Sequence, residues 1–144
     1  RYLFYDGLDR LRYDEYYQVL GTWTNEAFSY DSLGRLTTRF QPYSTTSNGY
    51  RIWAYDPLGR VTFERLYQPG GVLDRTTSYA YAGRKTSITD PLSRVHERVH
   101  DVAGRLRRSI DPSPGGTTLL DYDVFGNLNR IQDPGGAVST GSFN

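Results

Sequence analysis

Apolar and polar residues alternate along much of the chain. Phe28 and Tyr30 stand two residues apart, as do Trp53 and Tyr55, and polar residues such as Thr37 interleave with the apolar ones. A period of two places such pairs on the same face of a β-strand. The pattern therefore predicts short strands in a sheet with one wetter face.

Turn signals interrupt this alternation at short intervals. From residue 31 onward the turns begin 8 to 15 residues apart, near positions 31, 41, 56, 68, 82, 90, 101, 111, 123 and 133. Such spacing is typical of strands joined by hairpins, and it predicts an all-β fold of tandem antiparallel hairpins with roughly ten to twelve strands. We expect no helix, because the best candidate, residues 8–20, does not keep a 3.6-residue period.

The turns contain a repeated unit, Tyr-Asp-x-x-Gly-Arg followed by Leu or Val. Copies begin at Tyr5, Tyr30, Tyr55, His100 and Tyr122, and degenerate ones begin at Thr89 and Tyr81. The first two steps are 25 residues each. Weaker turn signals lie between the copies, at Gln41-Pro42, Gln68-Pro69-Gly70-Gly71, Asp111-Pro112-Ser113-Pro114-Gly115-Gly116 and Asp133-Pro134-Gly135-Gly136. A repeat this regular indicates an array of similar structural units.

The chemistry of the unit explains why it should turn. An Asp side chain accepts hydrogen bonds from backbone amides two residues on, and Gly adopts a positive φ at no steric cost. A type I turn closed by such a glycine is a hairpin with a bulge. We predict turn-forming roles for Asp31, Gly34, Asp56, Gly59, Asp101, Gly104, Asp123 and Gly126, and aromatic packing roles for Tyr5, Tyr30, Tyr55, Tyr81 and Tyr122.

Composition limits the class of protein. We interpret residues 1–144 as one repeat array without a second domain, and the absence of Met indicates a piece of a longer protein. The net charge of +1 gives no field that would attract nucleic acid, and no apolar run is long enough for a membrane span. With no cysteine, disulfides, thiol nucleophiles and cysteine-bound metals are excluded.

The repeat resembles the YD-repeat, or Rhs-repeat, family, whose consensus is Tyr-Asp-x-x-Gly-Arg-Leu with an Asp-Pro-x-Gly turn about ten residues later. The resemblance covers nearly the whole chain. It implies a curved, spiralling sheet that forms part of a hollow shell, in a large secreted or cell-surface bacterial protein. In polymorphic toxins and toxin complexes of this family the shell encloses a C-terminal toxin; animal teneurins carry a related shell.

One feature of the family is not matched. Many members end the shell with a self-cleaving Asp-Pro-x-Gly-Trp or Asp-Pro-x-Gly-Leu segment, whereas Asp56-Pro57-Leu58-Gly59 is followed by Arg60. We therefore assign no protease residue and no catalytic residue to this chain.

His96-Glu97-Arg98-Val99-His100 matches the His-Glu-x-x-His zinc motif in its letters. That motif needs a helix to place both imidazoles on one face. Here turns bracket the segment as a short strand, on which residues four apart are separated by about 13 Å. We therefore expect no metal site.

Two further patterns allow a functional and a structural interpretation. The Asp residues of the turns are typical of acid-base pairs or calcium ligands, but each already has a role in its turn. Arg10, Arg35, Arg60, Arg94 and Arg105 recur beside aromatic residues. Such rows bind sugars or polyanions in some proteins, and in others Arg stacks on the neighbouring Tyr within the sheet.

These observations predict a structural protein rather than an enzyme, with no cofactor. The expected function is a shell segment that encapsulates a C-terminal toxin or effector, and the alternative is an extracellular carbohydrate-binding or adhesion module. The expected partners are the remainder of the parent shell, the enclosed toxin and, for the alternative, cell-surface carbohydrate. Because a lone sheet leaves an apolar face and two strand edges open, we expect the isolated chain to self-associate.

Overall fold

The computed structural model describes residues 1–17, 21–43, 48–112 and 115–141, and the fold is all-β as expected. The strands are β1 (Tyr2–Tyr5), β2 (Leu11–Tyr17), β3 (Trp23–Tyr30), β4 (Leu36–Phe40), β5 (Tyr50–Tyr55), β6 (Val61–Tyr67), β7 (Leu73–Ala82), β8 (Lys85–Thr89), β9 (Val95–His100), β10 (Leu106–Asp111), β11 (Gly116–Tyr122), β12 (Leu128–Gln132) and β13 (Val138–Thr140). A single 3₁₀ turn, η1 (Pro69–Gly71), precedes β7 in the described part of the chain.

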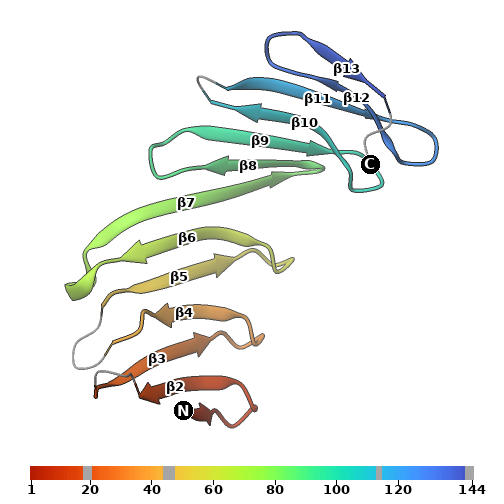
Figure 1. Cartoon of the computed structure of the whole chain (residues 1–144). Coiled ribbons are helices and arrows are strands. Elements are labelled where there is room, and N and C mark those ends of the chain that lie inside the picture. The colour runs from red at the N-terminus through yellow and green to blue at the C-terminus, as the bar shows by residue number, and fades with distance from the viewer. Residues whose placement is uncertain (18–20, 44–47, 113–114, 142–144) are drawn as a thin grey trace. The chain divides into compact units, whose positions relative to one another are not determined.

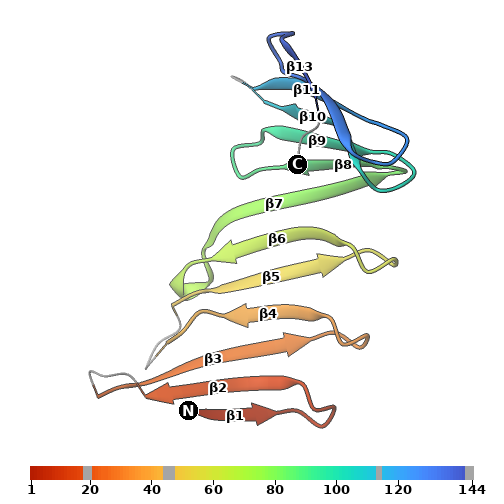
Figure 2. The same ribbon diagram turned by 45° about the vertical axis from the view of Figure 1, so that its right-hand side comes forward.

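Each strand is followed in the sheet by the next strand of the sequence, from β1 to β13 (Figure 1). The chain divides into two compact units, residues 1–77 and 78–144. In the first unit, β1 to β6 pair antiparallel in chain order. In the second unit, the end of β7 and strands β8 to β13 do the same (Figure 2). The expected tandem antiparallel hairpins are thus confirmed.

Every turn position expected from residue 31 onward falls at or next to a connection between two strands. The described residues contain thirteen strands rather than ten to twelve. The expected number rested on the turns from residue 31 onward, which join β3 to β13. Strands β1 and β2 lie before those turns and account for the difference. Ser113 and Pro114, in one of the weaker turns, lie outside the described residues.

The rejected helix candidate, residues 8–20, contains strand β2, which pairs with β1 and β3. Residues 18–20 lie outside the described part. The segment prefers a strand because its apolar residues do not form a helical stripe, and strand pairing satisfies its backbone hydrogen bonds on both sides.

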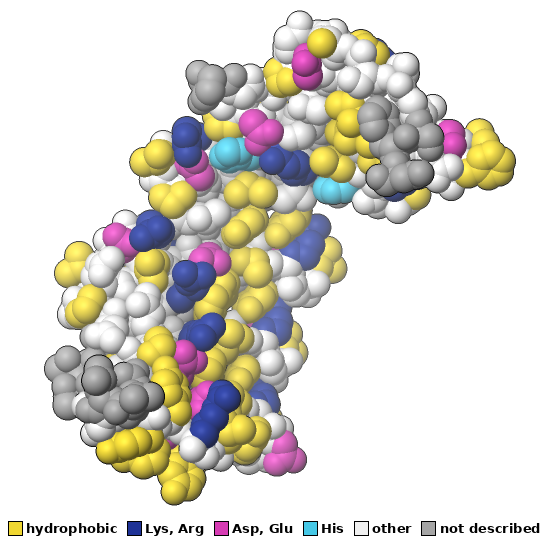
Figure 3. All heavy atoms as spheres, viewed as in Figure 1, with side chains coloured by type: hydrophobic (Ala, Val, Ile, Leu, Met, Phe, Trp, Pro, Cys, Tyr) yellow, Lys and Arg dark blue, Asp and Glu magenta, His cyan; other side chains and the backbone are white. Residues whose placement is uncertain are grey.

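The described residues of the two units form no buried apolar core. Among the residues that the structure describes, no apolar side chain is buried, and those that are buried are the polar residues Asp14, Thr24 and Ser109. Figure 3 shows apolar side chains exposed among basic and acidic ones. In each unit the sheet therefore holds together through its backbone ladders and through contacts between side chains of adjacent strands.

Candidate functional site

The repeated turn is the element that recurs throughout the chain, and Asp31 shows how it is built. Its Oδ1 accepts hydrogen bonds from the backbone amides of Leu33 and Arg35, both at 2.9 Å. The amide of Gly34 donates to the Asp31 carbonyl at 3.0 Å, and Gly34 has a φ of 82°. These contacts form a type I turn closed by a left-handed residue, and the strand register shifts at Tyr30 as a bulge requires.

The same backbone bond closes the turns that contain the other predicted turn residues. The amides of Gly59, Gly104 and Gly126 donate to the carbonyls of Asp56, Asp101 and Asp123 at 3.0 to 3.1 Å. Turns outside the full repeat use it as well, since the amides of Gly71 and Gly136 donate to the carbonyls of Gln68 and Asp133. One turn geometry therefore serves the strong turn signals and two of the weak ones.

A second contact fastens each full turn through its side chains. In what we call the Asp–Arg clasp, the guanidinium of the Arg four residues after the Asp forms an ion pair with that Asp at 2.6 to 2.8 Å. The clasps are Asp6–Arg10, Asp31–Arg35, Asp56–Arg60, Asp90–Arg94 and Asp101–Arg105. In the last full repeat Asn127 replaces the Arg, and its amide donates to Asp123 Oδ2 at 3.0 Å.

The clasp lowers the pKa of the turn carboxylates. The hydrogen bond from the Arg10 side chain, opposed by partial desolvation, lowers the pKa of Asp6 to about 2. For Asp90, desolvation acts to raise the pKa, but bonds from the Arg94 backbone and side chain outweigh it and lower the pKa to about 2. The carboxylates are therefore held in their charged form.

A third set of contacts connects each of several hairpins to the following one. In what we call the Arg–Tyr bridge, the Arg of one turn lies over the Tyr ring of the next repeat, 4.7 to 4.8 Å from the ring centroid. The bridges are Arg10–Tyr30, Arg35–Tyr55 and Arg105–Tyr122. The expectation that Arg stacks on Tyr within the sheet is met at these three positions.

The Tyr hydroxyl completes the bridge by donating to the backbone of the preceding hairpin. Tyr30 donates to the Leu11 carbonyl at 2.8 Å, and Tyr55 donates to the Leu36 carbonyl at 2.7 Å. Arg35 in turn donates from Nη1 to the Asp56 carbonyl at 3.1 Å. Consecutive hairpins are thus joined by side chains in addition to the backbone ladder.

Two of the expected packing residues belong to the first and to the shortened repeat. Tyr5, in the first repeat, is 56% exposed. Tyr81, in the shortened repeat, precedes the two-residue connection Gly83-Arg84, where Gly83 has a φ of 59°. The structure therefore places Tyr30, Tyr55 and Tyr122 in equivalent positions, each with its hydroxyl bonded to the preceding hairpin.

Sequence reasoning missed the double use of Arg, which clasps its own Asp and bridges to the next Tyr. A signal for the clasp was present in the sequence. Asp and Arg stand four residues apart in each copy of the repeat that contains both. In the copy that begins at Tyr122, Asn127 replaces the Arg and its side-chain amide donates to Asp123. The hydroxyl bond of Tyr has no local signal, because its acceptor lies 16 to 19 residues earlier.

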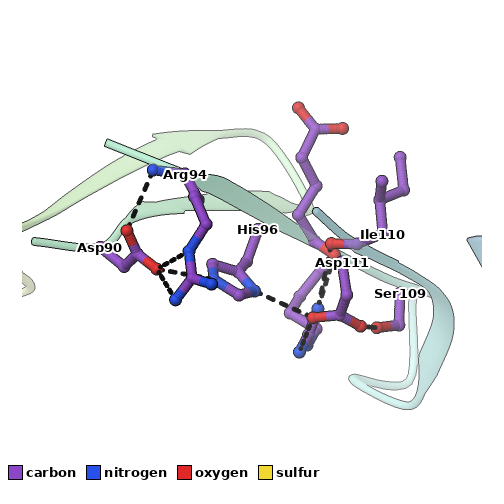
Figure 4. A network of polar contacts seen from close by, with 8 residues as sticks. Asp90, Arg94, His96, Ser109, Ile110 and Asp111 are labelled. Carbon is purple, nitrogen blue, oxygen red and sulfur yellow. Dashed lines mark hydrogen bonds and ion pairs between the residues drawn. The ribbon is translucent and has the colours of Figure 1, made fainter. Parts of the chain in front are cut away.

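The His-Glu-x-x-His segment lies on strand β9, as expected, and His96 belongs to a polar cluster around Asp111 (Figure 4). Asp111 Oδ1 is 2.9 Å from His96 Nδ1 and 2.9 Å from Arg98 Nη2, and its Oδ2 accepts a bond from Ser109 Oγ at 2.8 Å. Hydrogen bonds from His96, Ser109 and Arg98 lower the pKa of Asp111 well below its usual range.

This cluster contains Ser, His and Asp, but their order does not suit a nucleophile. Catalytic serine needs a base at its hydroxyl, with the carboxylate behind the base. Here Asp111 lies between Ser109 and His96. In this position Asp111 joins β9 to β10 through its contacts with His96, Arg98 and Ser109.

Hairpins joined in series by turns and bridges define a tandem β-hairpin repeat protein. Residues 100–138 match the model of the RHS Repeat family, which confirms the family resemblance predicted from the repeats. No curated protein matches the chain.

Solved structures show the same fold. The chain is similar to the crystal structures of TcdB2-TccC3-TEV, with 19% identity and a TM-score of 0.67, and of TcdB2-TccC3 without its hypervariable C-terminal region, with 20% identity and a TM-score of 0.68. It is also similar to the crystal structure of TcdB2-TccC3-Cdc42, with 20% identity and a TM-score of 0.67. In each case the match covers 92% of this chain and 9% of the solved chain.

Proposed function

We propose that this chain is a wall segment of a large secreted or surface-exposed bacterial protein, and that the complete wall encloses a C-terminal toxin or effector. Its role is architectural. The observation that carries the proposal is the Arg–Tyr bridge, which joins one hairpin to the next by the same contacts in successive repeats. A unit that contacts its neighbours in one repeated way extends into an array of any length.

The exposed apolar side chains support a larger assembly. Leu33 and Leu58 occupy equivalent positions at the tips of their turns and are 72% and 77% exposed. Phe125 occupies the same position in a later repeat and is 88% exposed. Apolar residues at so many tips favour burial against further protein, for which we propose the remainder of the parent shell.

The similar solved structures support the same proposal. This chain corresponds to 9% of each solved chain, and one of those structures lacks a hypervariable C-terminal region. We propose an equivalent arrangement here, in which a variable C-terminal segment follows the repeats and is the enclosed cargo. Among the described residues no helix has the length and apolar character to cross a membrane.

Limited proteolysis of the parent protein tests this function. The C-terminal segment should be cleaved far more slowly within the parent than as a separate protein. A parent carrying Tyr30→Phe, Tyr55→Phe and Tyr122→Phe, which removes three bridging hydroxyls, should protect it less. Tyr5→Phe, at an exposed ring, is the matched control and should protect it fully. Equal cleavage of the segment inside and outside the parent would refute enclosure.

A further inference from the structure

A hollow of about 280 Å³ lies in the first unit, beside strands β4 and β5. Arg39, Gln41, Pro42, Arg51 and Trp53 line it. This volume is close to the lower end of the range for small-molecule sites, roughly 300 Å³. The hollow is therefore large enough to hold one six-membered ring of a ligand.

The two Arg residues of the hollow lie side by side on one face of the sheet. Arg39 and Arg51 are direct partners in the register of β4 and β5. Like charges in this position repel. Each Arg pairs with a carboxylate on the strand that lies away from the other Arg. Arg39 pairs with Glu26 of β3 at 3.1 Å, and Arg51 pairs with Glu64 of β6 at 2.9 Å.

An anion between the two guanidiniums would reduce this repulsion. Among the described residues, the lining includes two guanidiniums, and the carboxylates that pair with them, Glu26 and Glu64, lie outside it. The side chains of Arg39 and Arg51 are 51% and 45% exposed, so donors remain within reach of solvent. A guanidinium has five N–H donors in a fork that matches a carboxylate. The hollow therefore favours a ligand with a negative group.

Trp53 provides the second part of the site. Its indole N–H donates to Glu64 Oε2 at 3.2 Å, which fixes the orientation of the ring. In contrast, the Tyr rings of the Arg–Tyr bridges are covered by guanidiniums of their own sheet. Trp53 thus supplies a flat apolar wall beside paired cations, and Gln41 adds an amide.

We infer that this hollow binds an acidic saccharide, with the carboxylate of a uronic acid between Arg39 and Arg51 and the sugar ring against Trp53. A second hollow of about 440 Å³, which also has Arg39 in its lining, contains Arg1, Asp14, Tyr16 and Glu26. The polar groups there are suited to the hydroxyls of adjoining sugars. Binding at this hollow does not require that the parent protein enclose a cargo.

Isothermal titration calorimetry of the full chain with a hexasaccharide of alternating glucuronate and N-acetylglucosamine tests the site. We expect saturable binding that weakens as NaCl is added. Arg39→Gln and Arg51→Gln should each weaken binding by about tenfold or more, because each removes a charged donor of the carboxylate. Neutral chitohexaose should bind at least about tenfold more weakly than the acidic hexasaccharide.

Arg65→Gln is the matched control. Arg65 is the register partner of Ile52, so it lies on the face opposite to Arg51 and Trp53. This variant changes the net charge equally and should keep the affinity of the unmodified chain, and circular dichroism checks that each variant is folded. Absence of saturable binding, equal weakening by Arg65→Gln, or equally tight binding of chitohexaose or of a hexaglutamate peptide would overturn the inference.

Discussion

The guanidinium of Arg35 lies 4.7 Å from the centre of the Tyr55 ring, and the Tyr55 hydroxyl donates to the carbonyl of Leu36, the residue after that Arg. The two residues therefore hold adjacent hairpins at two points, one through the ring face and one through the hydroxyl. Because Arg10–Tyr30 and Arg105–Tyr122 repeat the arrangement, its contribution can be measured at one position and compared at others.

Removal of one bridging hydroxyl should destabilise the chain modestly. Tyr55→Phe keeps the ring beneath Arg35 but leaves the Leu36 carbonyl without this donor. We expect the free energy of unfolding to fall by about 1 kcal/mol, measured by urea denaturation. Tyr5→Phe, at a ring that is 56% exposed, should change it by less than about 0.5 kcal/mol. Equal effects of the two variants would contradict a structural role for the bridge.

Lysine should not replace the bridging arginine. Arg35 Nε donates to Asp31 Oδ2 at 2.7 Å, Nη1 donates to the Asp56 carbonyl at 3.1 Å, and its plane covers Tyr55. An ammonium group lacks this planar fork, so Arg35→Lys should lower the free energy of unfolding by about 1–2 kcal/mol.

Arg75→Lys is the comparison for that measurement. Arg75 is 60% exposed and pairs with the adjacent Asp74. An exposed pair contributes little, so the change should cost less than about 0.5 kcal/mol in the same urea titration. If Arg35→Lys cost no more than Arg75→Lys, a positive charge alone would suffice at position 35 and the planar fork would not contribute to stability.

The stability of the fold should fall in acid, over the pH range in which the turn carboxylates become protonated. The pKa values of Asp6 and Asp90 in the folded chain, about 2, lie below their ordinary value of 3.8. Each carboxylate therefore stabilises the fold fully above pH 3.8 and loses this effect as the pH falls through its folded value. We expect the thermal midpoint to drop between pH 4 and pH 2, and Asp6→Asn to make that drop smaller. A midpoint that stays constant over this range would contradict the prediction.

Two turns should become more stable with glycine. Ser93 and Asp9 stand at the glycine position of their turns with φ values of 61° and 57°. A left-handed backbone costs an L-residue roughly 1–2 kcal/mol, and less for Asp. Ser93→Gly should therefore raise the free energy of unfolding by up to about 1 kcal/mol, and Asp9→Gly by less.

The reverse change at Gly59 tests the same principle. Gly59 has a φ of 81°, and an added Cβ would meet no atom within 4 Å. Gly59→Ala should thus cost about 1 kcal/mol through backbone strain alone. If Gly59→Ala had no effect on denaturation, the left-handed turn would not be the reason for glycine in the repeat.

Particular residues show how far local reasoning extends. Asp31 and Gly34 were assigned from sequence because their contacts join residues at most four positions apart. Arg35 was only partly understood, since its clasp to Asp31 is local whereas its guanidinium also donates to the carbonyl of Asp56, 21 positions later. The surroundings of His96 were not foreseen, because Asp111 comes into contact only through the pairing of β9 with β10.

The sequence by itself determined the turns, the strands between them and hence the order of hairpins, because these depend on backbone preferences and hydrogen bonds within about five residues. The tertiary structure decided which Arg covers which Tyr and brought Arg39 opposite Arg51 beside Trp53. Those relationships depend on strand register, since a shift of one residue moves every side chain of a strand to the other face.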